Sequence, residues 1–141
     1  MHCRARIQSA VSSLLIASLF PCASAVAGGT DFNVSASSFS DYTIDGFNDP
    51  ILSLQRGQAY NFLLDVTGHP FLIKTVRSTG NGNTFNNGVT NNGAQSGVLT
   101  FVVPLDAPDQ LFYNCGLHGA MGNTINITAA PAVFTNGFEG L

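Results

Sequence analysis

Hydrophobic and polar residues alternate in short runs along this chain, and clusters of turn residues separate the runs. The runs are rich in Val, Ile, Phe, Tyr and Thr, a composition typical of β-strands, and no long helical pattern interrupts them. We expect strands at residues 31–37, 42–45, 51–55, 58–66, 70–77, 97–103, 110–115 and 123–128. The pattern therefore predicts an all-β protein.

The patterns of two of these runs also predict where each strand lies in the fold. Residues 58–66 are nearly continuous in apolar side chains towards their end, which favours a central strand. At 123–128, Ile125 and Ile127 alternate with polar residues, as in a strand that is buried on one face. Short strands of this kind in about 100 residues favour an antiparallel sandwich of two sheets, and no chain remains for a second domain.

The first residues have the pattern of a targeting segment. Arg4 and Arg6 precede the short apolar run VSSLLIASLF at 11–20, and the small residues CASAVAGG follow. This order is typical of a secretory signal peptide, cleaved after Ala25 or Ala27, although an N-terminal helix buried in the fold is the alternative. The run is shorter than the roughly 20 residues that span a bilayer. We therefore expect a periplasmic or secreted protein with a signal peptide at 1–27, one domain at 28–129 and a C-terminal tail at 130–141.

The segment STGNGNTFNNGVTNNGAQSG, residues 78–97, is dominated by Gly and Asn, which favour turns. It is long for a loop inside a compact domain, so we expect it to be either functional or mobile. We predict a surface excursion that Phe85 and Val89 attach to the body of the protein.

Charge narrows the choice of partners. Removal of residues 1–27 leaves three basic residues, Arg56, Lys74 and Arg77, against eight acidic ones, a formal net charge of −5. Such a charge argues against nucleic acid or an anionic membrane surface as a partner. We expect a monomer without a membrane span.

The chain that remains after 1–27 has one cysteine, two histidines and one methionine, namely Cys115, His69, His118 and Met121. Three of them lie at steps of three in YNCGLHGAMGN, residues 113–123. An unpaired cysteine in an exported protein is a free thiol, an intermolecular bridge or a metal ligand. Taken singly, these residues have plainer explanations: a hydrogen-bonded histidine, a packed methionine, a small buried thiol. Their conjunction favours a metal site.

The spacing allows these side chains to meet. Cys115 ends a strand on the face that points inward. Gly116 and Gly119 give the following turn its backbone freedom, and His118 lies within a reach of at most about 10 Å. The other histidine, His69, opens the run PFLIKTV. Two imidazoles, a thiolate and a weak thioether are the donor set of a blue copper centre.

The order Cys115-x-x-His118-x-x-Met121, which closes a strand and precedes Gly122, resembles the ligand loop of the cupredoxins, the small blue copper proteins. Its short spacing is closest to that of amicyanin and plastocyanin-like domains, and His69 matches the family's first histidine. The resemblance covers roughly residues 42–128. It implies a Greek-key antiparallel β-sandwich, one type 1 copper ion, and one-electron transfer in the periplasm. It also implies that His69, Cys115 and His118 are equatorial ligands and Met121 the axial one, with no catalytic residue.

Two positions depart from the family pattern. Pro70 follows the first histidine, where the family usually has Asn, and Gly116 follows the cysteine, where Thr or Ser is frequent. The family uses the Asn side chain and amide to fix its ligand loop, and proline has no N–H to donate. Because such partners orient the ligands and tune the metal, the reduction potential does not carry over with the ligand set.

Electron transfer would need a docking surface for a redox partner. We predict an apolar patch around the edge of His118, formed by Gly116, Leu117, Gly119 and Ala120 with Pro70 and Phe71. The acidic charge favours a basic partner.

Other functions remain open at this stage. A copper carrier or storage domain would use the same ligands, and a metal-free binding module would use only the fold and the loop. Zinc fits a Cys-His-His site, but the affinity order favours copper and leaves Met121 without a role. We expect no enzyme, because a hydrolase built on Cys115 and His118 lacks a third orienting group.

Overall fold

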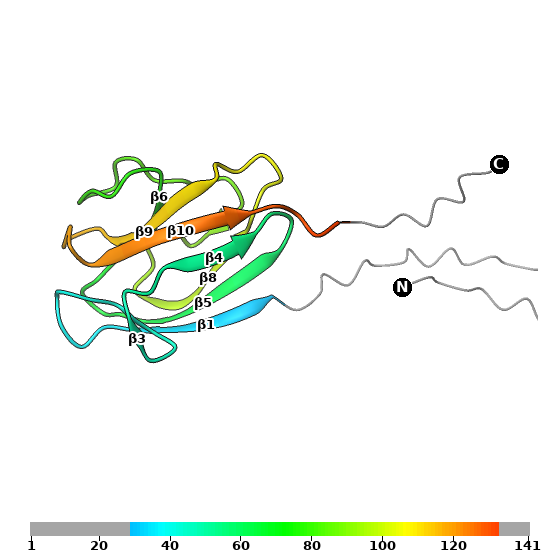
Figure 1. The fold of residues 1–141 in the computed structure, drawn as a ribbon. Helices are drawn as coiled ribbons and strands as arrows, with labels where there is room; N and C mark the ends of the chain where they lie inside the picture. The colour runs from blue at the N-terminus through cyan, green and yellow to red at the C-terminus, as the bar shows by residue number, and fades with distance from the viewer. Residues whose placement is uncertain (1–28, 133–141) are drawn as a thin grey trace, which may run out of the picture.

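The computed structural model describes residues 29–132, which form two β-sheets packed face to face (Figure 1). Ten strands and no helix occur in this range, so the all-β prediction is confirmed. None of these residues belongs to a helix long and apolar enough to cross a membrane. The predicted signal peptide at 1–27 and most of the predicted tail at 130–141 lie outside the described range, and both stay predictions.

The larger sheet has the strand order β3-β2-β1-β5-β8-β7, and the smaller sheet has the order β4-β10-β9-β6. The strands are β1 (Thr30–Ser35), β2 (Thr43–Ile44), β3 (Phe47–Asn48), β4 (Leu52–Gln55), β5 (Ala59–Asp65), β6 (Phe71–Lys74), β7 (Val89–Thr90), β8 (Ser96–Val102), β9 (Gln110–Cys115) and β10 (Gly122–Thr128).

Each sheet contains one parallel pair among antiparallel neighbours. β1 lies parallel to β5, and β4 lies parallel to β10. The chain passes from one sheet to the other after β3, β4, β5, β6 and β8, so strands that are not consecutive become neighbours. The predicted sandwich is confirmed, with sheets that are mixed. β5 is central, between β1 and β8, and Ile125 and Ile127 of β10 are buried, as their patterns predicted.

Aromatic rings fill the core between the sheets. The ring centroid of Phe71 lies 5.5 Å from that of Tyr113, 5.3 Å from that of Phe62 and 4.9 Å from that of Tyr42. All four side chains are fully buried. Burial of a large apolar side chain stabilises a fold by about 1.5–3 kcal/mol. This cluster therefore stabilises the part of the core on which the loops before β6 and after β9 rest.

The run predicted as a strand at 70–77 is shorter than expected, because β6 ends at Lys74. The Lys74 side chain is buried, and its ammonium group donates hydrogen bonds to the carbonyls of Ser78 and Gly80. These contacts turn the chain back after β6. Burial lowers the pKa of Lys74, since water no longer solvates its charge.

The Asn- and Gly-rich segment runs along β6, the edge strand of the smaller sheet. The side chain of Asn92 accepts a hydrogen bond from the amide of Ile73 at 2.8 Å and donates one to the carbonyl of Phe85 at 2.9 Å. Phe85 and Val89 pack against the core, as predicted. The segment therefore covers an edge that would otherwise expose unpaired backbone groups.

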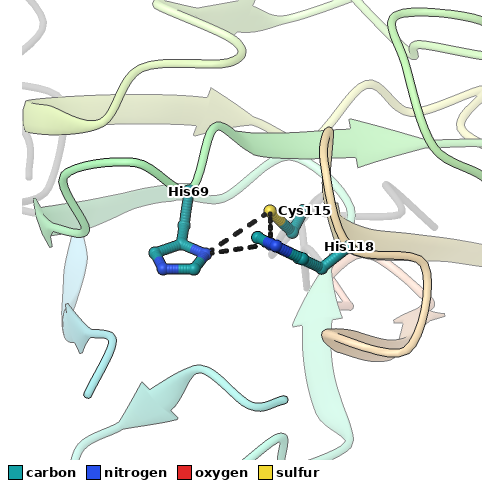
Figure 2. Close-up of side chains that lie close together, drawn as sticks. All are labelled: His69, Cys115 and His118. Atoms are coloured by element: carbon teal, nitrogen blue, oxygen red, sulfur yellow. Dashed lines mark hydrogen bonds between the residues drawn. The ribbon is translucent and has the colours of Figure 1, made fainter. Parts of the chain in front are cut away.

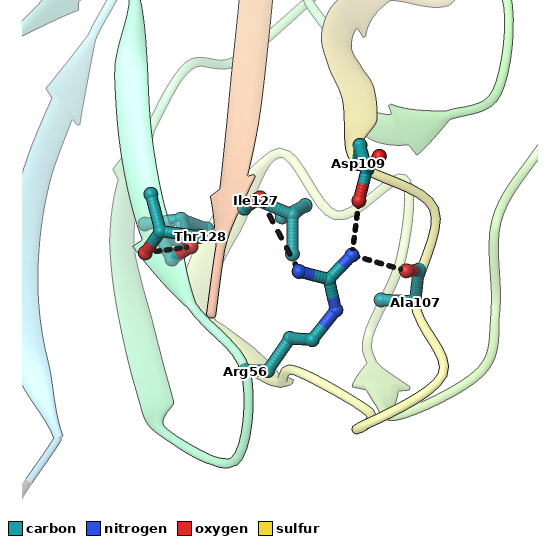
Figure 3. Close-up of polar contacts among 6 residues, drawn as sticks. Arg56, Ala107, Asp109, Ile127 and Thr128 are labelled. Atoms are coloured by element: carbon teal, nitrogen blue, oxygen red, sulfur yellow. Dashed lines mark hydrogen bonds and ion pairs between the residues drawn. The ribbon is translucent and has the colours of Figure 1, made fainter. Parts of the chain in front are cut away.

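The two ends of the sandwich differ, and we name them here. The terminal end is the one at which both ends of the described chain lie (Figure 1). There the Arg56 guanidinium lies 2.6 Å from the Asp109 carboxylate and donates hydrogen bonds to the carbonyls of Ala107 at 2.8 Å and Ile127 at 3.5 Å (Figure 3). The opposite end, which we call the ligand end, carries the candidate metal centre.

Candidate metal centre

His69, Cys115 and His118 come together at the ligand end (Figure 2). Sγ of Cys115 lies 3.8 Å from Nδ1 of His69 and 3.6 Å from Nδ1 of His118, and the two Nδ1 atoms are 3.2 Å apart. Metal bonds to imidazole and thiolate are about 2.0–2.3 Å long, so one ion between these atoms can touch all three. The structure thus brings together three of the four predicted ligands.

Met121, the fourth predicted ligand, is fully buried in the same loop. Its amide donates a hydrogen bond to the carbonyl of His118 at 3.2 Å, and its carbonyl accepts one from the amide of Cys115 at 2.9 Å. These two bonds fix the backbone of Met121 beside the other two residues of the loop. That its sulfur completes the site stays a prediction.

Cys115 is the last residue of β9 and pairs with Phe71 of β6. Its side chain is fully buried, as the strand pattern predicted, and it is a free cysteine. The amide of Leu117 donates a hydrogen bond to Sγ at 3.4 Å. This contact fixes the position of the sulfur relative to the backbone of the loop that follows β9.

His69 lies in the turn between β5 and β6. Gly68 precedes it with φ of +85°, a backbone conformation that favours glycine. The amide of Gly68 donates to the side chain of Gln95 at 2.6 Å, and the amide of His69 donates to the carbonyl of Val66 at 2.8 Å. The turn is therefore closed by hydrogen bonds before the chain enters β6, and its geometry sets where the His69 ring emerges.

Asn114 holds the loop that carries His118, and sequence reasoning missed it. Its side-chain amide donates to the carbonyls of His118 at 3.3 Å, Gly119 at 3.3 Å and Met121 at 2.6 Å. Asn114 is fully buried, and among the described residues no partner contacts its Oδ1. Asn114 is distinguished by being a fully buried polar side chain next to the cysteine. Burial of this side chain is not visible in the sequence, so the sequence offered no signal for its role.

A second segment braces the same loop from outside. The exposed Arg77 donates to the carbonyl of Ala120 at 2.7 Å, and the amide of Gly80 donates to the carbonyl of Gly116 at 2.6 Å. Both residues belong to the chain that Lys74 turns back after β6. The ligand loop is thus bonded on its inner side by Asn114 and on its outer side by this segment.

Asp49 fixes the exit of the loop. Its carboxylate accepts hydrogen bonds from the amide of Gly122 at 3.0 Å and from the amide of Tyr42 at 2.9 Å. Partial burial raises the pKa of Asp49, and the two amide donors act in the opposite direction. The start of β10 is therefore tied to the segment that precedes β2.

The surface around His118 differs from the predicted patch. Leu117 is 63% exposed, and the ring of Phe39, which is 72% exposed, lies 6.0 Å from that of His118. Gly116 and Phe71 are buried, so placing them on the patch was wrong. Phe71 is the first residue of β6, and its side chain points into the core. Gly116 is covered by the side chains of Leu72 and Pro70. Phe39 was not predicted, because its loop is distant from His118 in the sequence. Leu117, Gly119 and Ala120 are exposed beside His118 in the chain, and Pro70 is half-buried.

The donor chemistry limits which ions fit. A thiolate and two imidazoles suit copper, zinc and related ions, whereas magnesium and calcium prefer oxygen ligands. One donor is at the end of β9, and the other two are in the loop after β9 and in the turn before β6. Hydrogen bonds fix the backbone at all three positions, and the thiol is buried. The described residues of this centre fit a copper ion.

Comparisons with known proteins agree with the fold. No family model matches the sequence, and no curated protein matches it either. The solved structure of rusticyanin from Thiobacillus ferrooxidans matches with a TM-score of 0.51 and 19% sequence identity, over 72% of this chain and 79% of that one. A second structure of rusticyanin, described as a copper protein, matches with a TM-score of 0.51 and 17% identity, over 72% of this chain and 80% of that one. The chain therefore has the fold of the cupredoxins, which confirms the fold that the ligand-loop resemblance implied.

Proposed function

We propose that this protein binds one copper ion through His69, Cys115, His118 and Met121 and carries single electrons between redox partners outside the cytoplasm. The observation that carries the proposal is the convergence of a buried thiol and two imidazole nitrogens within 4.8 Å of one another. This donor set, with a thioether available in the same loop, is that of a blue copper centre.

Copper bound here would supply a one-electron couple between Cu(II) and Cu(I). The role of the chain is to hold the donors in one arrangement for both oxidation states. Asn114, Asp49 and Arg77 bond the backbone of the ligand loop on different sides. A loop fixed in this way reorganises little when the charge of the site changes, which favours fast electron exchange.

Electrons would enter and leave through the partly exposed His118. Its ring lies beside Phe39 and next to Leu117 in sequence, two exposed apolar side chains. An apolar surface at the rim of a redox centre lets a partner approach closely without displacing tightly bound water. The net charge of −5 in the chain after residue 27 would favour a basic partner.

Export is part of the proposal. Arg4, Arg6 and the apolar run at 11–20 support a signal peptide. A single free thiol, Cys115, fits an oxidising compartment when it is buried and bound to metal.

Reduction of the copper-loaded protein in the presence of a Cu(I) chelator tests electron transfer against copper carriage. An electron carrier keeps its copper through repeated cycles of reduction and reoxidation, and its visible absorption returns each time. Ready loss of Cu(I) to the chelator would contradict electron transfer and favour the carrier function.

A matched pair of surface variants tests the docking surface. Leu117→Glu should slow electron self-exchange between oxidised and reduced copies at least about tenfold, because a charge replaces an apolar contact at His118. Val98→Glu adds the same charge at an exposed valine of β8 and should change the rate much less. Equal effects of the two variants would contradict docking at His118.

A further inference from the structure

Tyr42 lies in the core directly beneath the candidate metal centre. Its side chain is fully buried, and its ring packs edge-on against Phe71 at a centroid distance of 4.9 Å. It immediately precedes β2 and is 27 residues before His69 in the sequence. Tyr42 is not one of the proposed ligands, and the proposed function gives it no role.

The hydroxyl of Tyr42 points at the backbone that carries the first ligand. It lies 3.0 Å from the carbonyl of His69 and 3.1 Å from the carbonyl of Pro70 and donates to them. Burial raises the pKa of Tyr42, and the charge of the neighbouring Cys115 raises it further. Because a carbonyl cannot donate, the hydroxyl is the donor in both contacts.

The same carbonyl links Tyr42 to the cysteine side of the centre. The carbonyl of Pro70 also accepts a hydrogen bond from the amide of Gly116 at 3.0 Å. Proline has no N–H of its own, so the carbonyl oxygen is the one backbone atom of Pro70 that can hydrogen-bond. One oxygen atom thus receives donors from Tyr42 and from the residue after Cys115.

The backbone of Tyr42 is connected through Asp49 to the end of the loop that carries His118 and Met121. Its amide donates to the Asp49 carboxylate at 2.9 Å, and its carbonyl accepts from the amide of Asp49 at 2.8 Å. The same carboxylate accepts from the amide of Gly122, which follows Met121. Tyr42 is therefore connected by short hydrogen bonds to the turn of His69, the start of the ligand loop and its exit.

We propose that Tyr42 is a positioning residue of the metal centre: its hydroxyl clamps the His69–Pro70 backbone and thereby sets the position of the His69 ring relative to Cys115. This proposal rests on the proposed copper function for its spectroscopic test, but the clamp itself concerns only residues of this chain. A phenol that served packing alone would have no effect on the centre beyond general stability.

Tyr113 is a matched control in the same core. Its ring is fully buried and stacks on Phe71 at 5.5 Å, and its hydroxyl donates to the carbonyl of Pro50 at 2.7 Å. Tyr42→Phe and Tyr113→Phe each remove one buried hydroxyl that bonds a carbonyl and leave the ring in place. Only the first removes hydrogen bonds to the backbone of a proposed ligand, His69, and of the residue after it.

The first measurement uses the copper-loaded protein. Tyr42→Phe should weaken copper binding about tenfold or more, as loss of a group that orients a ligand typically does, and should shift the thiolate-to-copper absorption. Tyr113→Phe should change the dissociation constant less than about threefold and leave the spectrum unchanged. Equal changes in both variants, or a wild-type spectrum and affinity in Tyr42→Phe, would overturn the proposal.

The second measurement uses the metal-free protein. Amide hydrogen exchange of Gly116 reports on the Pro70 carbonyl, and exchange of Phe62 in β5 corrects for global unfolding. Relative to Phe62, Gly116 should exchange about tenfold faster in Tyr42→Phe and at the wild-type rate in Tyr113→Phe. Unchanged exchange in Tyr42→Phe would overturn the clamp. If the wild-type protein binds no copper, the proposed function fails, and this second measurement alone decides the role of Tyr42.

Discussion

At the ligand end, buried side chains hold the backbone, whereas at the terminal end the backbone is held mainly by its own hydrogen bonds. Asn114 and Tyr42, both fully buried, donate between them to five carbonyls within or next to the centre, namely those of His69, Pro70, His118, Gly119 and Met121.

The terminal end closes differently. Backbone amides there donate to backbone carbonyls, as from Gly57 to Val103 at 2.8 Å and from Val103 to Gln58 at 2.9 Å. Side chains contribute through Arg56 and its ion pair with Asp109, whose side chain is 95% exposed. Two hydroxyls add to this: that of Tyr60 accepts from the amide of Gln55 at 2.8 Å, and that of Thr128 donates to the carbonyl of Leu54 at 3.3 Å.

The two ends differ in their hydrogen bonding because their loops have different tasks. Connections at the terminal end only have to join strands, and ordinary turns do so with backbone hydrogen bonds. Loops at the ligand end must point three or four side chains at one place, so their carbonyls cannot all find backbone partners. Buried donors from Asn114 and Tyr42 satisfy these carbonyls and fix the loop geometry together.

The largest effect should come from a pair of glycines, one at each end. Gly122 has φ of +137° and Gly88 has φ of +77°, and an added Cβ would lie 2.1 Å from the carbonyl oxygen of Tyr113 and 2.0 Å from that of Val102, respectively. Gly122→Ala and Gly88→Ala should each lower the free energy of unfolding by about 3 kcal/mol or more, through backbone strain and overlap. Urea unfolding of the metal-free variants measures this.

Copper binding separates the two glycine variants. Gly122→Ala displaces the exit of the ligand loop and should weaken copper binding, whereas Gly88→Ala, which meets Val102 at the terminal end, should keep the wild-type affinity when folded. The same loss of affinity in both variants would show that the two ends are not independent.

A smaller effect is expected from removal of one side-chain donor at each end. Asn114→Ala leaves three carbonyls without their donor and should cost about 2–3 kcal/mol of stability and about 10- to 100-fold in copper affinity. Arg56→Met should cost about 1–2 kcal/mol, since it removes a charged donor from a partly exposed site. Chelator competition on both variants should find a loss of affinity only in Asn114→Ala; a comparable loss in Arg56→Met would contradict the comparison.

The smallest effect concerns pH. Burial raises the pKa of Asp49 in the folded state above its value of 3.8 in the unfolded chain. The unfolded state therefore binds fewer protons between these two values, and the stability contributed by protonated Asp49 is complete below pH 3.8 and is lost as the pH rises through the folded pKa. Asp49→Asn removes this term. Unfolding free energies of the metal-free proteins between about pH 3 and pH 7 should therefore fall for the wild type relative to Asp49→Asn as the pH rises, and parallel profiles would contradict burial of the charge.

Local sequence pattern predicted much of the fold and three of the residues that converge. Alternation identified the strand of Ile125 and Ile127, and the apolar run identified central β5, because both signals come from neighbours in the chain. The spacing from Cys115 to Met121 placed three of the four predicted ligands in one loop. The parallel pairs of β1 with β5 and β4 with β10 were not predicted, since they join segments that are distant in sequence.

The supporting residues of the centre were missed for the same reason. Tyr42 and Asp49 lie in a stretch with no ligand-like spacing, and their role depends on carbonyls and amides that only tertiary folding brings near. Phe39 reaches His118 from a loop in the same way. Phe71 was wrongly placed at the surface because an apolar residue next to a ligand has the same pattern whether it lines a patch or the core.

Copper coordination by Cys115 is tested by the visible spectrum of the purified protein, lacking residues 1–27, after addition of one equivalent of Cu(II). We expect an intense thiolate-to-copper charge-transfer band in the wild-type protein and none in Cys115→Ser, because the Cys115 thiolate is the donor of that transition. A wild-type spectrum without this band, or a band that persists in Cys115→Ser, would contradict this coordination.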